Sequence, residues 1–141
     1  MNLEEFKLRY EEAKSERPKV FEYMQIDPPA SDSELDAVEE AMGCPFEMSH
    51  REFLKTFGGG EFGLGLLFSA NEQSEWHVPS QVLNQQLPSN QFFPVSDNFA
   101  GDIYGFEIIE GKCVAPLKVY DHESAELKDT KFNNVFEFMD R

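Results

Sequence analysis

The chain has 141 residues, enough for one domain that buries its own hydrophobic core without help from metals or disulfides. Its 27 acidic and 12 basic residues give a formal net charge of −15, which repels nucleic acid and anionic membranes. The charged N-terminus lacks the apolar run of a signal peptide, and no apolar stretch approaches the length of a membrane span. We therefore expect a single cytoplasmic, soluble domain over residues 1–141 that binds neither nucleic acid nor membranes.

Apolar residues near the N-terminus recur every three or four positions and predict an amphipathic helix over residues 2 to about 16. These residues are Leu3, Phe6, Tyr10 and Ala13. Asn2 is available as the helix cap, and the helix should stop before Pro18. Residues 19–26 fit either a short strand or a helical turn, and the Asp-Pro-Pro at residues 27–29 predicts an extended linker.

A second helix is predicted directly after this linker. Ser31 and Glu34 match the S-x-x-E capping box, in which each side chain bonds a backbone N–H of the first helical turn, and Gly43 marks the end. The apolar stripe between these signals consists of Leu35, Val38, Ala41 and Met42. The opposite face carries Asp32, Asp36, Glu39 and Glu40. Such an acidic face is usually just solvated.

A third helix is predicted before the glycine run at residues 58–60. Ser49 and Glu52 match a second capping box, and Met48 and Phe53 have the spacing of a hydrophobic staple. The apolar face consists of Phe53, Leu54 and Phe57, and both phenylalanines are expected in the core. One glycine is enough to end a helix in the left-handed conformation. Three indicate that the backbone also passes close to another segment, most simply the sheet that follows.

Strands are predicted mainly in the second half of the chain. They cover residues 62–69, 92–96, 102–109 and 113–120, with a turn at residues 97–98 and a hairpin at residues 110–111. Pro116 indicates that the last strand lies at a sheet edge or is broken. Residues 71–90 are polar and predict a long excursion with one helical turn near residues 79–87. A closing helix is predicted from the spacing of Phe132, Val135, Phe136 and Met139.

The sequence holds little that points to catalysis or metal binding. It contains no motif of an activated nucleophile, no P-loop and no dinucleotide-binding glycine pattern. Cys44 and Cys113 lie far apart without CxxC spacing, which favours buried thiols over a zinc or redox site. His122 lies between Asp121 and Glu123, a set that could bind a metal but is more typical of a polar turn after a strand. We predict no catalytic residue, no cofactor and no metal site.

The acidic residues are unevenly distributed, because no Lys or Arg occurs between Lys55 and Lys112. Acids do occur there, at Glu61, Glu72, Glu75, Asp97, Asp102, Glu107 and Glu110. One interpretation is a solvated surface that keeps the protein soluble. The other is a face that docks a basic partner, formed by Glu61, Glu72, Glu75, Asp97 and Asp102 with Trp76 as an aromatic anchor. The alternative role for Trp76 is to fill the core.

Several motifs resemble those of the SUKH superfamily, which contains fungal cell-wall-synthesis regulators and many bacterial toxin-immunity proteins. The signature "lG..lP..y..fl...nGG" resembles residues 42–46 and 53–60. Its later motifs, "flpi", "GD.y..d", "v..wdhe" and "sF.eFl", are similar to residues 93–95, 101–106, 119–123 and 132–139. The chain departs from the pattern at Phe46, Phe57 and Tyr120. The resemblance covers about residues 30–139 and leaves residues 1–29 as an N-terminal helix and linker.

The resemblance implies an α+β fold, a single SUKH-like domain in which N-terminal helices and a C-terminal helix pack on a mostly antiparallel sheet. It also implies a non-enzymatic protein-binding module without a cofactor. Bacterial members neutralise a cognate polymorphic toxin, commonly a nuclease, so a basic toxin domain is the expected partner. The alternative is a regulatory or adaptor domain with no toxin partner.

Overall fold

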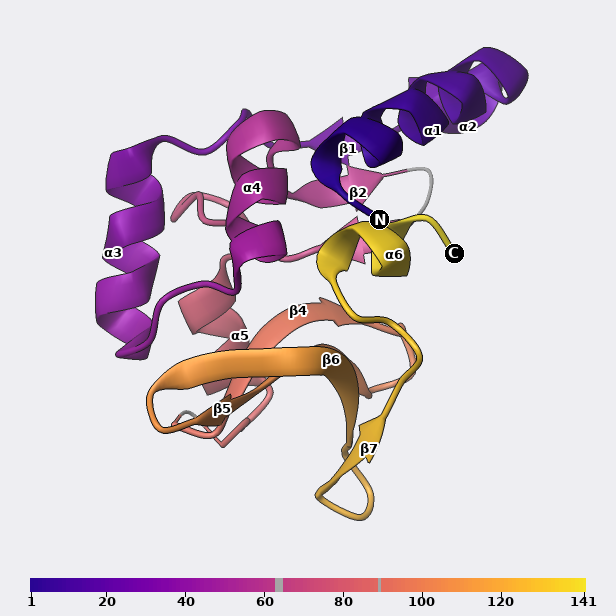
Figure 1. Ribbon diagram of the computed structural model, residues 1–141. Helices are drawn as coiled ribbons and strands as arrows, with labels where there is room; N and C mark the ends of the chain where they lie inside the picture. The colour runs from indigo at the N-terminus through magenta and orange to yellow at the C-terminus, as the bar shows by residue number, and fades with distance from the viewer. Residues whose placement is uncertain (63–64, 89) are drawn as a thin grey trace.

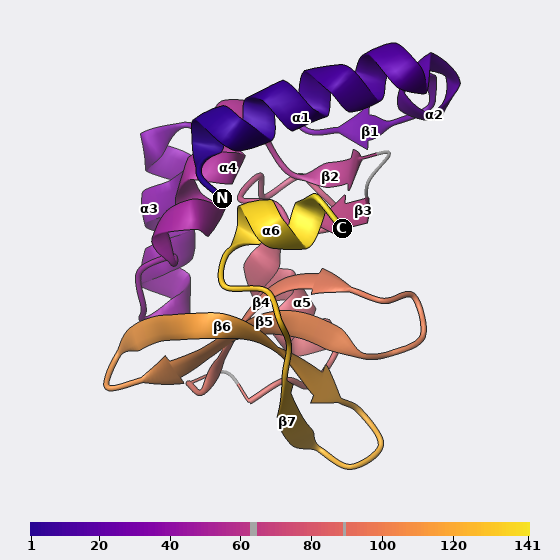
Figure 2. The ribbon, with the colours of Figure 1, turned by 45° about the vertical axis from the view of Figure 1, so that its right-hand side comes forward.

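The computed structural model describes residues 1–62, 65–88 and 90–141 and shows an α+β domain with two antiparallel sheets. Helices α1 to α4 lie on one side of the molecule, the four-stranded sheet lies on the other, and α6 lies between them (Figures 1 and 2). This arrangement confirms the expected fold class. Within the described residues, no helix combines the length and apolar character needed to cross a membrane.

The N-terminal segment forms α1 (Leu3–Glu16), α2 (Pro18–Glu22) and β1 (Gln25–Ile26). The side chain of Asn2 accepts a hydrogen bond from the Glu5 N–H at 2.9 Å, so the predicted cap of α1 is confirmed. Residues 18–26 hold both structures that the sequence allowed, a short helix and then a short strand.

Helix α3 (Asp32–Met42) has the capping box that the sequence predicted. Ser31 Oγ accepts from the Glu34 N–H at 3.1 Å, and Glu34 Oε1 accepts from the Ser31 N–H at 3.0 Å. Gly43 ends the helix in the left-handed conformation with φ 67°.

Helix α4 (Met48–Phe57) begins earlier than predicted, and its cap is Glu47. The Glu47 carboxylate accepts from the His50 N–H at 3.0 Å, which places Ser49 inside the first turn. The predicted Ser49 capping box is therefore wrong. The staple is also wrong, because the Met48 side chain is 74% exposed while Phe53 is fully buried.

The three glycines after α4 run against other backbone segments, as the sequence predicted. A side chain at Gly58 would meet the carbonyl oxygens of Asp27 and Pro28, and one at Gly59 would meet the Ser69 Cα at 2.7 Å. The close neighbours of these two glycines are thus the linker at residues 27–29 and the chain beyond the first sheet.

The first sheet has the order β1-β2-β3, with β2 (Gly60–Phe62) and β3 (Gly65–Leu67) paired antiparallel. The sequence predicted one strand over residues 62–69, which is wrong because Phe62 lies opposite Gly65. A continuous apolar run carries no sequence signal for a turn within it, so the sequence did not indicate where the chain reverses direction. Residues 63–64 of that prediction lie outside the described residues.

The second sheet has the order β4-β5-β6-β7, formed by Phe92–Asp97, Ile103–Ile109, Lys112–Asp121 and Glu126–Asp129. The first three strands were predicted, and β7 was not. The β5–β6 pairing shifts between Gly105 and Glu107, opposite the segment that contains Pro116, so the proline marks a break and not an edge. The Phe68 N–H donates to the Val95 carbonyl at 2.8 Å and joins the two sheets.

The core is rich in phenylalanine and joins the N-terminal helices to α6 (Val135–Met139). The Phe6 ring lies 5.2 Å from that of Phe53 and 5.8 Å from that of Phe136. Phe57 is half-buried and packs at the edge of this cluster, so of the two expected core phenylalanines only Phe53 is fully buried. Helix α5 (Val78–Asn84) confirms the helical turn predicted within residues 71–90, of which residue 89 lies outside the described residues.

Candidate protein-binding surface

Three of the five acids of α3 pair with two bases of α4, which the sequence did not indicate. The Arg51 guanidinium contacts Asp36 at 3.2 Å and Glu39 at 3.1 Å, and the Lys55 ammonium contacts Asp32 at 3.0 Å. The face that was predicted to be simply solvated is thus an inter-helical ion network. These three carboxylates link the two helices, while Glu34 and Glu40 of α3 have no cationic partner within the described residues.

The acids between Lys55 and Lys112 are different. Within the part of the chain that the structure describes, no cationic nitrogen lies within 4.0 Å of the carboxylates of Glu61, Glu72, Glu75 or Asp97. Two other acids of this segment do have partners: Asp102 contacts His122, and Glu107 contacts Lys118 at 3.0 Å. The base-free stretch therefore supplies carboxylates that the fold itself does not neutralise.

A groove of about 550 Å³ lies between α3 and the segment that follows β3. Small apolar side chains line it, at Ala37 and Ala41 of α3 and at Ala70, together with the carboxylates of Glu34 and Glu72. An adjoining hollow of about 320 Å³ shares Ala41 and extends to Leu83 of α5, whose side chain is 80% exposed. This combination can receive a protein segment that carries both apolar and basic side chains.

The segment that carries Glu72, Glu75 and Trp76 is held in place by hydrogen bonds. The Ser69 N–H donates to the Trp76 carbonyl at 2.8 Å, and the Gln81 amide donates to the Glu75 carbonyl at 2.9 Å. The Trp76 side chain is half-buried and packs against the core. Burial lowers the pKa of His77 in the same segment, and the nearby Glu72 carboxylate opposes this shift.

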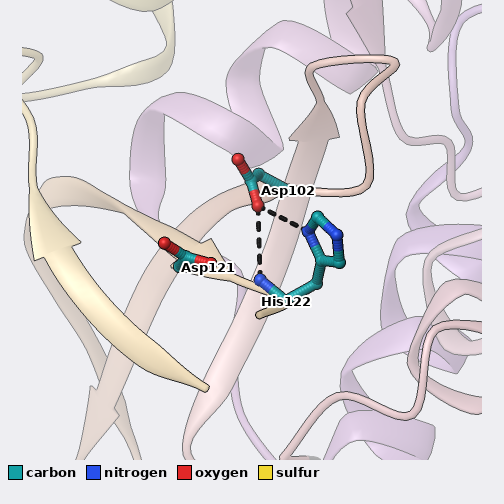
Figure 3. Close-up of side chains that lie close together, drawn as sticks. All are labelled: Asp102, Asp121 and His122. Atoms are coloured by element: carbon teal, nitrogen blue, oxygen red, sulfur yellow. Dashed lines mark hydrogen bonds and ion pairs between the residues drawn. The ribbon is translucent and has the colours of Figure 1, made fainter. Parts of the chain in front are cut away.

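Asp102, Asp121 and His122 form a polar cluster that joins the β4–β5 loop to the turn between β6 and β7 (Figure 3). His122 Nδ1 and Asp102 Oδ1 lie 2.8 Å apart, and the Lys128 ammonium donates to Asp121 at 2.9 Å. The hydrogen bond to His122 lowers the pKa of Asp102, and the same bond raises the pKa of His122. Lys128 and neighbouring backbone N–H groups lower the pKa of Asp121 to about 2.

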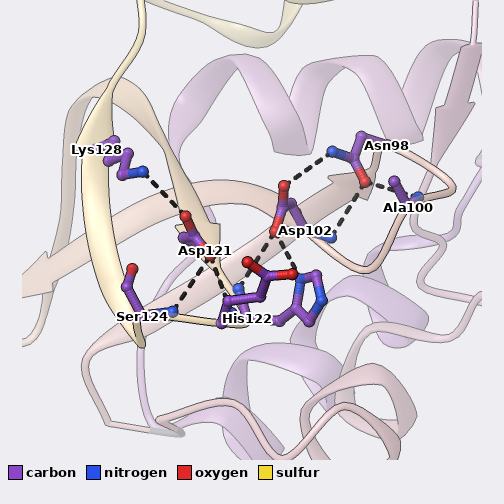
Figure 4. Close-up of polar contacts among 8 residues, drawn as sticks. Asn98, Ala100, Asp102, Asp121, His122, Ser124 and Lys128 are labelled. Atoms are coloured by element: carbon purple, nitrogen blue, oxygen red, sulfur yellow. Dashed lines mark hydrogen bonds and ion pairs between the residues drawn. The ribbon is translucent and has the colours of Figure 1, made fainter.

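One ligand atom from each of these three residues lies within 4.8 Å of the others, which is the geometry of a possible cation site. The carboxylate oxygens of this cluster already accept hydrogen bonds from the protein, however. Asp102 Oδ1 also accepts from the His122 N–H at 3.2 Å, and Asp121 Oδ1 accepts from the Glu123 N–H at 2.9 Å (Figure 4). The network links the β4–β5 loop to the turn after β6.

The two cysteines, far apart in sequence, meet in the fold. Cys44 is buried, Cys113 of β6 is half-buried, and their sulfur atoms lie 3.8 Å apart as free thiols. Burial raises the pKa of both. The protonated forms are therefore favoured at neutral pH.

The structure divides the six residues of the predicted docking face between separate environments. Glu72 lines the groove beside α3, and Glu75 and Trp76 belong to the same segment. Glu61 lies elsewhere, in a hollow that it shares with Phe99. Asp97 and Asp102 flank the loop that carries Phe99. The sequence did not single out Phe99, because an apolar residue in a turn has no periodic signal.

Comparison with known families decides the classification. The family model described as SMI1-KNR4 cell-wall, a SUKH family, matches residues 32–139. The chain belongs to this SUKH family. A search of curated proteins gives no match.

The SUKH match begins with the first residue of α3 and ends with the last residue of α6, so α1, α2 and β1 precede it. These elements still share its core, because Phe6 of α1 packs on Phe53 and Phe136. SUKH domains of the SMI1-KNR4 type are generally non-catalytic, immunity-type protein-binding modules. At the level of the family, the chain is therefore a protein-binding module.

Proposed function

We propose that this SUKH domain is an immunity protein that binds and neutralises a basic toxin domain, such as a nuclease. The observation that carries the proposal is the contrast between two sets of acids. Three acids of α3, Asp32, Asp36 and Glu39, pair with Arg51 and Lys55, whereas Glu72, Glu75 and Asp97 have no cationic partner within the described residues. Unpaired carboxylates on a protein of charge −15 attract a basic partner and repel nucleic acid.

Contacts in the groove between α3 and residues 70–79 would make the binding specific for one partner. Its lining of small apolar side chains can exclude water around a partner's apolar residues, and Glu34 and Glu72 can pair with flanking bases. Charge would set the association rate, and the apolar contacts would set the dissociation rate.

The direct test is neutralisation of a toxin domain encoded by the neighbouring gene. Co-expression with the chain should restore growth, and the two proteins should elute together in gel filtration. A reversed variant, with Glu72, Glu75 and Asp97 changed to Lys, should lose both properties. A control variant, with the exposed Glu5, Glu12 and Glu16 of α1 changed to Lys, carries the same change in net charge and should retain both.

Neutralisation by the reversed variant at the wild-type level would contradict the claim that these three carboxylates attract the toxin. Absence of neutralisation by the wild-type chain, with a folded and active neighbouring toxin, would contradict the immunity function and favour an adaptor role. Because Asp97 is half-buried, a variant with only Glu72 and Glu75 changed to Lys separates loss of binding from loss of folding.

A further inference from the structure

A hollow of about 380 Å³ lies between three segments that are far apart in sequence. Its lining includes Val20 and Tyr23 at α2, Glu61 of β2, and Phe99 of the β4–β5 loop. In Figure 2, α2, the ends of β2 and β3, and the β4–β5 loop lie one below another along one edge of the molecule. The hollow is separate from the groove beside α3.

Two aromatic side chains at this hollow are unusually exposed. Tyr23 is 80% exposed and Phe99 is 74% exposed, and Val20 beside them is 47% exposed. A group of large exposed apolar side chains contributes little to the stability of the isolated chain and marks interaction surfaces. Tyrosine and phenylalanine are also among the residues enriched at the centres of protein interfaces.

The loop that presents Phe99 is held in one conformation. Asp97 accepts from the Phe99 N–H at 3.2 Å. The Asn98 side chain accepts from the Ala100 N–H at 2.8 Å and the Asp102 N–H at 3.1 Å (Figure 4). Phe99 itself has a φ of 60°, a left-handed conformation that costs free energy for a residue with a side chain. These bonds hold the loop backbone that carries Phe99, which reduces the backbone entropy lost on binding.

The negative charge of Glu61 favours a cationic side chain as the group that binds in the hollow. Glu61 is half-buried, and within the described residues no cationic nitrogen lies within 4.0 Å of its carboxylate. None of the residues that line the hollow is basic, and the Arg141 guanidinium, which lies beside Gly65, is stacked on Phe138. A carboxylate beside two aromatic rings is the chemistry that recognises a guanidinium group, which pairs with the carboxylate and stacks on the rings. Lysine satisfies the same charge but lacks the planar face.

We propose that the hollow formed by Tyr23, Phe99 and Glu61 binds an arginine side chain of a protein partner. The inference rests on the proposed function for the identity of that partner, and it adds a second contact outside the groove beside α3. The hollow is large enough for one long side chain and leaves the rings free to contact its neighbours.

The test uses a blocked tripeptide, acetyl-Gly-Arg-Gly-amide, and needs no toxin. Titration at low salt, followed by two-dimensional NMR, should give saturable shifts at Tyr23, Glu61 and Phe99. The same peptide with citrulline, the neutral isostere of arginine, should give no saturable shifts. A lysine peptide should bind about threefold more weakly or worse, because it stacks less well on the rings.

Two variants and two matched controls assign the site. Glu61→Gln and Phe99→Ser should each weaken arginine binding about threefold or more. Glu75→Gln, another unpaired acid, and Leu83→Ser, another exposed apolar residue, should leave it unchanged. Equal binding of the citrulline or lysine peptide, or wild-type binding by Glu61→Gln, would overturn the proposal. None of these results depends on toxin neutralisation, so failure here leaves the proposed function intact.

Discussion

Ser31 and Ser49 begin two identical sequence motifs, yet only Ser31 caps a helix. Ser49 lies two residues after Glu47, which caps α4, and its hydroxyl instead accepts from the Val135 N–H at 2.9 Å. The motif therefore served two purposes, a local cap in α3 and a long-range link between α4 and α6.

Replacing Ser31 with Ala should lower the free energy of unfolding by about 1 kcal/mol, because the Glu34 N–H loses its partner. Ser33→Ala is the matched control, since Ser33 is exposed within the first turn of the same helix. Urea unfolding of both variants measures the difference. Equal stability of the two variants would show that the capping box contributes nothing.

His50 makes the protein sensitive to acid. The imidazole is fully buried next to Phe46 and Phe93, and neither ring nitrogen has a hydrogen-bond partner in the described structure. Burial lowers its pKa to about 3, and the nearby backbone of Phe68 opposes the shift only partly. The unfolded chain therefore binds a proton near its ordinary pKa of about 6.5, while the folded chain stays neutral.

Stability should accordingly be complete above about pH 6.5 and fall as the pH drops toward the folded pKa. Between pH 7 and pH 5, His50 should account for a loss of about 2 kcal/mol in the free energy of unfolding. Urea unfolding at both values compares the wild type with His50→Gln, which removes the titrating group. An identical pH dependence in the two proteins would show that His50 is not held neutral.

At the scale of elements, the glycine run fixes how α4 passes the linker and the first sheet. Gly58 has φ 83° and lies against the backbone at Asp27 and Pro28, whereas Gly111 in the β5–β6 hairpin has φ 76° and open space around it. Gly111→Ala measures the cost of a positive φ in open space, whereas Gly58→Ala adds both the crowding and a ψ of 179° that only glycine readily combines with a positive φ. Gly111→Ala should cost about 1–2 kcal/mol, and Gly58→Ala should cost about 1–3 kcal/mol more.

Thermal or urea unfolding of the two glycine variants decides between these costs. A larger loss for Gly58→Ala supports close backbone packing. A loss no greater than that of Gly111→Ala would mean that the linker moves away freely.

Local signals in the sequence predicted much of the element pattern. The caps and apolar stripes of α1 and α3, the strands β4 to β6 and the closing helix follow from spacing alone. Strand β7 could not be predicted, because its four residues, Glu-Leu-Lys-Asp, have no apolar alternation and form a strand by pairing with β6. The start of α4 depended on whether Glu47 or Ser49 reached the free N–H groups, which tertiary packing decides.

The candidate surface was only partly predictable for a related reason. The absence of bases between Lys55 and Lys112 is visible in the sequence, but the acids that find a cation in the fold are not. Glu107 meets Lys118 across two strands, and Asp102 meets His122 across two loops. Tyr23 and Phe99 come together only through the tertiary fold. The sequence thus indicated that the surface is negatively charged, and the structure showed which residues lie together on it.

At the scale of the whole molecule, the 12 basic residues are unevenly distributed among the 27 acidic ones, and the net charge is −15. Ion pairs between α3 and α4 and within the second sheet reduce the field there, whereas Glu61, Glu72, Glu75 and Asp97 have no cationic partner within the described residues. Such a field accelerates encounters with a basic partner and weakens with ionic strength over a Debye length of about 10 Å at 0.1 M salt.

The association rate with an inactivated cognate toxin domain tests this account most directly. At low salt, the reversed variant (Glu72, Glu75 and Asp97 to Lys) should associate about tenfold or more slowly than the wild type. The control variant (Glu5, Glu12 and Glu16 to Lys) should lose much less, and the difference between the variants should shrink as salt screens the charges. Association of the reversed variant at the wild-type rate in low salt would contradict the claim that these unpaired carboxylates steer the basic partner toward the chain.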